Sequence, residues 1–204
     1  MKRTASVVLA LAVVVAAALA STAVAGKSAA TKSQALSCSN TLKLAIMTPL
    51  TGDAGFIGQE QLYWARYAVK TLPAKYGLKI KLLEGDTQLS AELASSLAQK
   101  YVADKSVVGI IGPATSGAVE NTSLTLFQAG IAHVSPSATR VRLTKGAVKT
   151  ATPGFFRIVP DDGIQGPADA RYMVEQLKAK KVVVVDSQEP YSVGLADAIQ
   201  TYLK

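Results

Sequence analysis

The chain has 204 residues, of which 49% are hydrophobic, 6% aromatic and 18% charged, and its 22 lysine and arginine residues exceed 14 acidic ones, giving a formal net charge of +8. High apolar content, a single cysteine and only one long apolar run exclude a disordered tail, a collagen-like or cysteine-rich scaffold and a polytopic membrane protein. The length exceeds a usual domain of about 100 to 150 residues and is short for two.

Residues 1–25 have the layout of a secretory signal peptide. A basic start precedes an unbroken apolar run from Val7 to Ala20, and Ala23–Ala25 is a small-x-small cleavage site. The run is shorter than the roughly 20 residues that span a bilayer, which disfavours the alternative of a retained anchor. We therefore expect an exported protein of the periplasm or cell envelope, with a flexible Ala/Ser/Lys-rich linker over residues 26–40.

Cys38 and the basic residues bear on possible partners. Cys38 lies well after the apolar run, which disfavours a lipid-modified cysteine and leaves a free thiol or a disulfide to a partner outside this chain. The densest basic set has no interleaved aromatic residues, so we expect a solvated loop and no nucleic-acid partner. This set comprises Arg140, Arg142, Lys145 and Lys149.

From Thr41 onward, short apolar strands alternate with amphipathic helices. We expect strands over 42–47, 79–83, 107–111, 131–134 and 155–159. The first predicted helix has Leu62, Ala65, Val69 and Leu72 on its inward face and is stopped by Pro73 and Gly77. The second helix is capped by Ser90 and has Leu93, Leu97 and Tyr101 on one face. The third helix has Val119, Ser123, Leu126 and Phe127 on its inward face and is ended by Gly130. This order predicts a doubly wound α/β lobe with a parallel sheet over residues 41–160, whose ligand lies beyond the carboxyl ends of the strands.

Residues 161–204 begin a second pattern after the turn at Pro160–Gly163. The expected elements are a helix with Ala170, Met173, Val174 and Leu177 on one face, a strand over Lys181–Asp186, and a helix with Leu195, Ile199 and Tyr202 on one face. One strand between two helices cannot form a two-sided sheet by itself. We therefore expect the beginning of a second, similar lobe that is incomplete.

Two loops of the first lobe offer binding groups. Gly112–Gly117 opens a helix, whose free N–H groups and dipole, with the Ser116 hydroxyl, suit a carboxylate. The lysine and metal ligand of a phosphate loop are missing after Gly117, and an ordinary helix cap remains the alternative. Loops after adjacent strands open into one crevice, so Ser137 and Thr139 are expected to face Ser116, although such a segment is often only a turn.

The sequence offers no catalytic constellation. His133 is the only histidine and lies within a predicted strand, where we expect a packed, hydrogen-bonded residue. No G-x-S-x-G, zinc motif or G-x-G-x-x-G fingerprint is present where catalysis or a dinucleotide would require it. We therefore expect a binding protein rather than an enzyme, with no cofactor and no metal.

Several short motifs, in order and spacing, resemble one known family. They are Thr48–Gly52, Ile111–Pro113 with Ser116 and Gly117, Ser135–Thr139, Phe156–Pro160, Gln165–Pro167 and Tyr191–Ala196. Over Leu42 to Lys204 the chain resembles type I periplasmic binding proteins, in particular the branched-chain amino acid group that serves ABC transporters. In that family two α/β lobes close around a small ligand.

The resemblance implies a role for each matching position. Ser116 and the Thr139 backbone would hold the ligand carboxylate; the Ser137 carbonyl and Thr139 hydroxyl would hold its ammonium; and Tyr191 would approach from the second lobe. Gly117, Ala138, Phe56 and Ile57 complete the expected ligand-binding positions, and Phe56 and Ile57 stand where leucine-binding proteins offer a tyrosine. The family's acidic partner for the ammonium would lie beyond Lys204.

The expected function is an exported solute-binding protein. It would capture an amino acid of the branched-chain type, or a similar small carboxylate, and deliver it as a monomer to an ABC permease in the cytoplasmic membrane. The alternatives are a sensor domain of the same fold and an exported hydrolase. A transmembrane helix and signalling module after Lys204 would favour the sensor, and turnover of an ester or amide would favour the hydrolase.

Overall fold

The computed structural model describes residues 41–145 and 154–204. The expected signal peptide and linker, together with Cys38 and Lys149, lie outside the described residues. Within the part that is described, no helix has both the length and the apolar character needed to cross a membrane.

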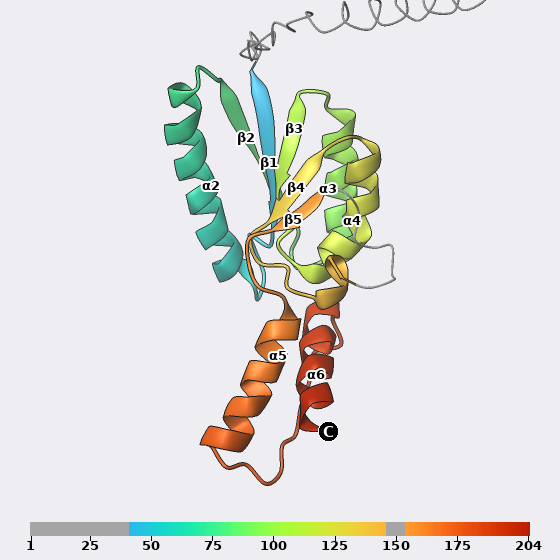
Figure 1. The fold of residues 1–204 in the computed structure, drawn as a ribbon. Helices are drawn as coiled ribbons and strands as arrows, with labels where there is room; N and C mark the ends of the chain where they lie inside the picture. The colour runs from blue at the N-terminus through green and yellow to red at the C-terminus, as the bar shows by residue number, and fades with distance from the viewer. Residues whose placement is uncertain (1–40, 146–153) are drawn as a thin grey trace, which may run out of the picture. The chain divides into compact units, whose positions relative to one another are not determined.

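A parallel sheet of five strands forms the centre of the fold, in the order β2-β1-β3-β4-β5 (Figure 1). Its strands are β1 (Leu42–Thr48), β2 (Ile80–Asp86), β3 (Val107–Ile111), β4 (Ala132–Ser135) and β5 (Phe155–Arg157). The predicted α/β class and parallel sheet are confirmed, although β5 is shorter than the expected 155–159. Because all strands run in one direction, the loops that follow them gather at one edge.

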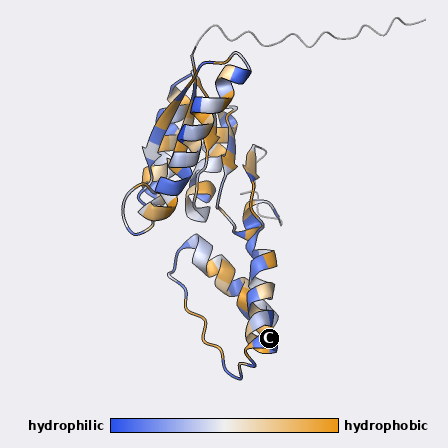
Figure 2. Ribbon diagram, turned by 90° about the vertical axis from the view of Figure 1, so that its left-hand side faces the viewer, coloured by the Kyte–Doolittle hydropathy of each residue, from blue (hydrophilic) through white to orange (hydrophobic). Residues whose placement is uncertain are grey.

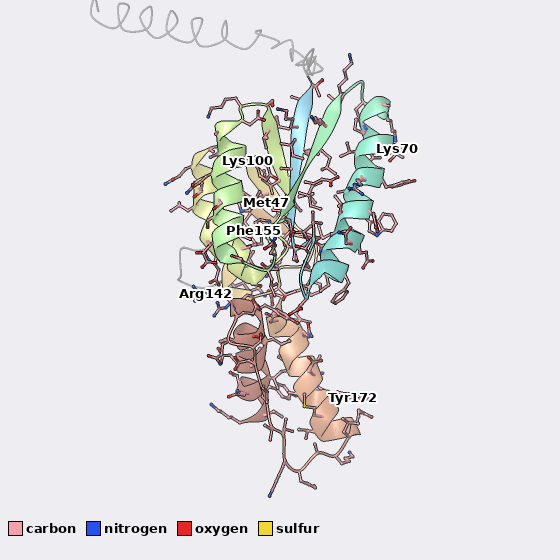
Figure 3. The ribbon with its side chains drawn as sticks, turned by 180° about the vertical axis from the view of Figure 1, so that it is seen from behind. Met47, Lys70, Lys100, Arg142, Phe155 and Tyr172 are labelled. Atoms are coloured by element: carbon pink, nitrogen blue, oxygen red, sulfur yellow. The ribbon has the colours of Figure 1, made fainter. Side chains whose placement is uncertain are left out.

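Helices lie on both faces of this sheet, and on one face they pack mainly against β1 and β2 (Figures 1 and 3). These are α2 (Gly55–Lys75) on one side, and α3 (Ala91–Ala103) and α4 (Ser116–Gln128) on the other. Alternate residues of β1 point to opposite faces, so Met47 packs in the core with Tyr101 of α3, and Ile46 packs with Leu62 of α2. Figure 3 shows Lys70 of α2 pointing away from the sheet, as the exposed side of an amphipathic helix requires.

The C-terminal part of α2 differs from the sequence prediction. Pro73 lies inside the last turns of the helix instead of stopping it, and the chain turns at Gly77, which has a φ of +66°. Leu72, expected in the core, is 54% exposed. It lines an open apolar groove with Leu44 and Ile80. The predicted helical period is therefore correct, but nothing within the described residues covers this end of the apolar face of α2.

Residues 161–204 form a helical hairpin (Figure 1). It consists of α5 (Asp162–Arg171), which continues as the π-helical turn η2 (Tyr172–Gln176), and α6 (Pro190–Leu203). Gly166 of α5 lies against Ala198 of α6, with Ala170, Ala196 and Ile199 also buried. Small residues therefore let the two helices approach closely.

The predicted strand over Lys181–Asp186 is wrong. The segment forms no strand, and Val183 and Val185 are 87% and 85% exposed. Figure 2 shows the hydrophobic character of this connection between α5 and α6. A strand needs a neighbour to satisfy its backbone groups, and none lies beside this segment among the residues that the structure describes.

Candidate functional site

A cavity of about 420 Å³ lies where the loops after the strands meet the start of α6. Its lining residues are Pro49, Ala54, Ile57, Leu89, Ala114, Thr115, Ser116, Ser137, Thr139, Ser187, Glu189 and Tyr191. The wall combines apolar side chains with hydroxyl groups, a carboxylate and a phenol. Its size and its mixture of apolar surface with a few polar groups are typical of a small-molecule site.

The structure brings together Ile57, Ser116, Ser137, Thr139 and Tyr191, which the sequence analysis selected. The remaining candidates, Gly117, Ala138 and Phe56, do not line this cavity. Ala138 is buried against Val119, Leu143 and Phe155, and Gly117 lies against the Pro190 ring. Phe56 is 75% exposed on α2, because its neighbour Ile57 takes the position facing the cavity.

The start of α4 supplies the electropositive end of the cavity. Thr115 is the N-cap, and its hydroxyl accepts a hydrogen bond from the Ala118 N–H at 3.4 Å. The Ser116 hydroxyl oxygen accepts a bond from the Arg140 N–H at 3.2 Å, which leaves its own hydrogen to donate. The unpaired N–H groups of a first helical turn and the helix dipole favour an anion here.

Hydrogen bonds of Ser137 fix the loop after β4. Its hydroxyl donates to the Ala114 carbonyl at 2.7 Å and accepts from the Gln61 amide at 2.9 Å, and the Gln61 carbonyl oxygen accepts from the Thr48 hydroxyl at 2.8 Å. Since the Ser137 hydroxyl is already bonded on both sides, its backbone carbonyl is the group that remains for a ligand. This is the group that the family resemblance implied.

Thr139 has the one side chain of this loop that keeps an unused polar group. Its carbonyl accepts from the Asp162 N–H at 3.0 Å, which joins the loop to α5. Its hydroxyl oxygen is buried and accepts no hydrogen bond among the described residues, and the hydroxyl lies close enough to the Asp162 carboxyl group to lower the pKa of that group. An unpaired buried hydroxyl costs free energy, and a ligand that bonds to it recovers that cost.

Next to Thr139, Asp162 carries a buried carboxyl group. The residue is 0% exposed, and neither carboxylate oxygen has a hydrogen-bond partner in the described part of the chain. Burial raises the pKa of Asp162, although the adjacent Thr139 hydroxyl and the nearby charge of Arg157 act in the opposite direction. Arg157 itself donates to the carbonyls of Ala138 and Arg140.

Replacing Asp162 with asparagine is therefore expected to stabilise the fold at neutral pH, by about 1 kcal/mol. A raised carboxyl pKa in the folded state means that the wild type is favoured below the unfolded value of 3.8 and loses stability as pH rises through the folded pKa. The gain from Asp162→Asn should thus disappear in acid. Urea unfolding at several pH values measures it.

Asp161→Asn is the matched control. The Asp161 carboxylate caps α5 through the Gly163 N–H at 3.0 Å and pairs with Lys145 at 2.7 Å, so its neutralisation should destabilise slightly. If Asp162→Asn also destabilised at pH 7 but not in acid, the Asp162 carboxylate would be ionised and paired in the folded protein.

Of the basic residues expected in a solvated loop, Arg140 and Arg142 form ion pairs with α4. The Glu120 carboxylate of α4 lies 2.9 Å from the Arg140 guanidinium and 3.1 Å from that of Arg142. Both arginines belong to the short turn around η1 (Val141–Leu143), whose Leu143 is buried. Because Leu143 anchors this turn in the core, the neighbouring arginines are held against α4.

The hairpin contributes Glu189 and Tyr191 to the cavity. Glu189 is the N-cap of α6, with its carboxylate accepting from the Ser192 N–H at 3.0 Å. Burial raises the pKa of Tyr191, and the carboxylates of Asp162, Glu189 and Asp169 raise it further. Glu189 therefore contributes a carboxylate near the Tyr191 phenol in the cavity wall.

Sequence reasoning missed Leu89 as well as Glu189. Leu89 follows β2, and both it and Gln88 have positive φ angles, of 62° and 48°. Asp86 holds this turn and the loop after β1 together, accepting from the N–H groups of Gln88 at 3.0 Å and Leu50 at 2.7 Å. The rule that loops after neighbouring strands share one crevice, applied to β2, was the available signal for Leu89.

His133 lies apart from the cavity lining. It is buried, its Nε2 is 3.0 Å from the Ser123 hydroxyl, and burial lowers its pKa. The expected packed and hydrogen-bonded histidine is confirmed. No group of three or more His, Cys, Asp or Glu side chains suited to a metal ion occurs within the residues described.

Comparison with known proteins assigns the chain to a family. A family model described as periplasmic binding protein matches residues 41–204. The chain belongs to the periplasmic binding protein family. This confirms the resemblance found in the motifs between Leu42 and Lys204.

Curated members of the family match at moderate identity. A leucine-specific-binding protein of Salmonella typhimurium is 30% identical over 166 residues, which cover 80% of this chain and 44% of the relative. An amino acid binding protein of Pseudomonas aeruginosa is 29% identical over 163 residues, covering 78% and 42%. The chain thus spans less than half the length of these curated relatives.

Solved structures of periplasmic binding proteins share the fold. A leucine binding protein from Thermotoga maritima has a TM-score of 0.72 and 26% identity, covering 80% of this chain and 45% of its own. A branched-chain amino acid transporter substrate binding protein from Streptococcus pneumoniae, in complex with isoleucine, also has a TM-score of 0.72, with 28% identity and coverage of 81% and 47%. The expected periplasmic-binding-protein fold is confirmed.

Proposed function

We propose that the chain is the ligand-binding part of an extracytoplasmic solute-binding protein. It captures an amino acid of the branched-chain type, or a similar small carboxylate, without chemical turnover, and delivers it to an ABC permease. One observation carries this proposal: the bond between Ser116 and Arg140 holds the start of α4 and the unused Thr139 hydroxyl at one cavity. The names of the leucine- and isoleucine-binding relatives agree with it.

The cavity supports a definite orientation of the ligand. The carboxylate lies at the start of α4, where the Ser116 hydroxyl and the first N–H groups of the helix donate to it. The ammonium lies at the Ser137 carbonyl and the Thr139 hydroxyl, and the aliphatic side chain lies against the apolar wall formed by Ile57 and Leu89. Tyr191 closes the cavity from the hairpin.

The mechanism is a shift from an open to a closed arrangement of two lobes. Residues 41–160 form the first lobe in this proposal, and residues 161–204 begin the second. A ligand that contacts both favours the closed state by its additional interactions there. The protein is exported by a signal peptide over residues 1–25, followed by a linker over 26–40, and acts as a monomer.

Ligand-observed NMR with the exported chain tests this function and detects millimolar affinities. The panel contains branched-chain and other amino acids, the corresponding carboxylic acids, amides and esters. We expect binding of at least one α-amino acid or carboxylate that is displaced by a second. Absence of binding throughout the panel, or hydrolysis of an ester or amide, would contradict the proposal.

Thr139→Ala is expected to weaken binding of such a ligand about tenfold, since a hydrogen bond to a charged group is lost. Stability should change by less than about 1 kcal/mol, because the hydroxyl accepts no hydrogen bond within the described residues and its interaction with the Asp162 carboxyl group lacks good hydrogen-bond geometry. Titration of both proteins with the same amino acid measures the effect. Thr139→Ser, which keeps the hydroxyl, is the control and should bind normally; equal affinity of the alanine variant would refute the contact.

A further inference from the structure

Glu189 brings an acidic group of this chain to the cavity wall. As the N-cap of α6, it uses carboxylate oxygen Oε1 to accept from the Ser192 N–H at 3.0 Å. No lysine or arginine forms an ion pair with it among the residues that the structure describes. Its carboxylate therefore has capacity to accept a further charged hydrogen bond.

The cavity is lined by groups of opposite electrostatic character. The start of α4 presents N–H groups and the Ser116 hydroxyl. Glu189 adds a carboxylate, which together with the nearby Asp162 acts on the Tyr191 phenol. A ligand with a carboxylate and an ammonium group a few ångströms apart complements this arrangement.

The unpaired Thr139 hydroxyl is an independent indication of a ligand at this place. Thr139 lines the cavity, and its buried hydroxyl oxygen accepts no hydrogen bond in the described part of the protein. An ammonium group has three hydrogens to donate. The Thr139 hydroxyl and the Ser137 carbonyl accept two of them, and the third requires one more acceptor.

We propose that Glu189 is that acceptor and determines specificity for ligands that carry an ammonium group. The inference rests on the proposed function and adds a residue to it: the carboxylate that caps α6 also receives the ligand's ammonium. The chain then holds an acidic partner for the ligand within its own residues. The Glu189 side chain then both caps α6 and binds the ligand, so the amino group of the ligand contacts the hairpin directly.

The test compares leucine with 4-methylpentanoate, which has the same carbon skeleton and carboxylate but no amino group. Both are titrated by ligand-observed NMR into the wild-type chain and into Glu189→Gln. The amide retains an oxygen that caps α6 but loses the charge. We expect wild type to prefer leucine, and Glu189→Gln to reduce that preference about tenfold while binding 4-methylpentanoate unchanged or more tightly.

Glu175→Gln serves as the matched control. It removes the same charge from η2, outside the cavity, and should keep the wild-type preference. A preference unchanged in Glu189→Gln would overturn the role of Glu189 and leave the proposed function intact. An equal loss for both ligands together with a lower melting temperature would assign Glu189 to the helix cap alone. Wild-type protein that binds neither leucine nor any other member of the panel would overturn both proposals.

Discussion

Replacing Gly58 with alanine is expected to destabilise the protein by about 3 kcal/mol and to impair ligand binding. A Cβ atom at this position would lie 1.7 Å from the carbonyl oxygen of Pro49 and 3.0 Å from the Thr48 hydroxyl oxygen. Both are held by the sheet and its loop, so the start of α2 must move away. Pro49 and Ile57 line the cavity on either side of this contact, and its shape changes with them. Urea unfolding and ligand titration measure the two effects.

Gly194→Ala is a suitable comparison for the Gly58 variant. It also lies in a helix, but its Cβ would meet the side chain of Arg140, whose Cγ is 2.9 Å away, rather than backbone. Alanine is a better helix former than glycine by about 1 kcal/mol, which offsets part of the cost of shifting the Arg140 side chain from its ion pair with Glu120, so this change should destabilise less than Gly58→Ala. If both variants lost the same stability, general loss of glycine, rather than the contact with Pro49, would be responsible.

Gly166→Ala is expected to separate the two helices of the hairpin, at a cost of about 2 kcal/mol. The new Cβ would lie 2.5 Å from the Ala198 Cβ and 2.9 Å from the Ala198 carbonyl carbon. Because α6 carries Glu189 and Tyr191, ligand binding should also weaken. Hydrogen exchange should accelerate at the amides of α5 and α6 and stay slow in β1 and β3.

Ala198→Gly in the Gly166→Ala background checks this explanation. The second change removes the closest contact, while on its own it costs about 1 kcal/mol in helix propensity. The double variant should therefore be more stable than the sum of the two single effects predicts. Simple additivity would show that the two residues do not press against each other.

The sheet was predictable because each strand carries its own signal. The apolar runs at β1 and β3 are flanked by helices whose apolar residues recur every three or four positions. This alternation of strands and helices permits few arrangements other than a parallel sheet. The positions of Ser116 and Thr139 in one crevice followed from the same rule, since both come after adjacent strands. Local pattern and topology agree at these positions.

Features that depend on a distant neighbour were not predictable. The valines of 182–185 have the composition of a buried strand, but pairing depends on a partner that the pattern does not contain. Glu189 has no motif around it, and only the packing of α6 against the first helical turn of α4, through Pro190 and Gly117, brings it to the cavity. Leu72 is a further example, because its place on the apolar face of α2 could be predicted but the absence of a covering element among the described residues could not.

The hydrogen-bond chain from Thr48 through Gln61 and Ser137 to Ala114 has a thermodynamic consequence. It joins α2 to the end of β1 and to the loops after β3 and β4 without a ligand, so these segments have already lost conformational entropy when the ligand binds. Less of the binding free energy is then spent on ordering this wall of the cavity. In the proposed mechanism, the remaining cost is that of closing the second lobe, so differences in affinity between ligands should reflect mainly their contacts with α6.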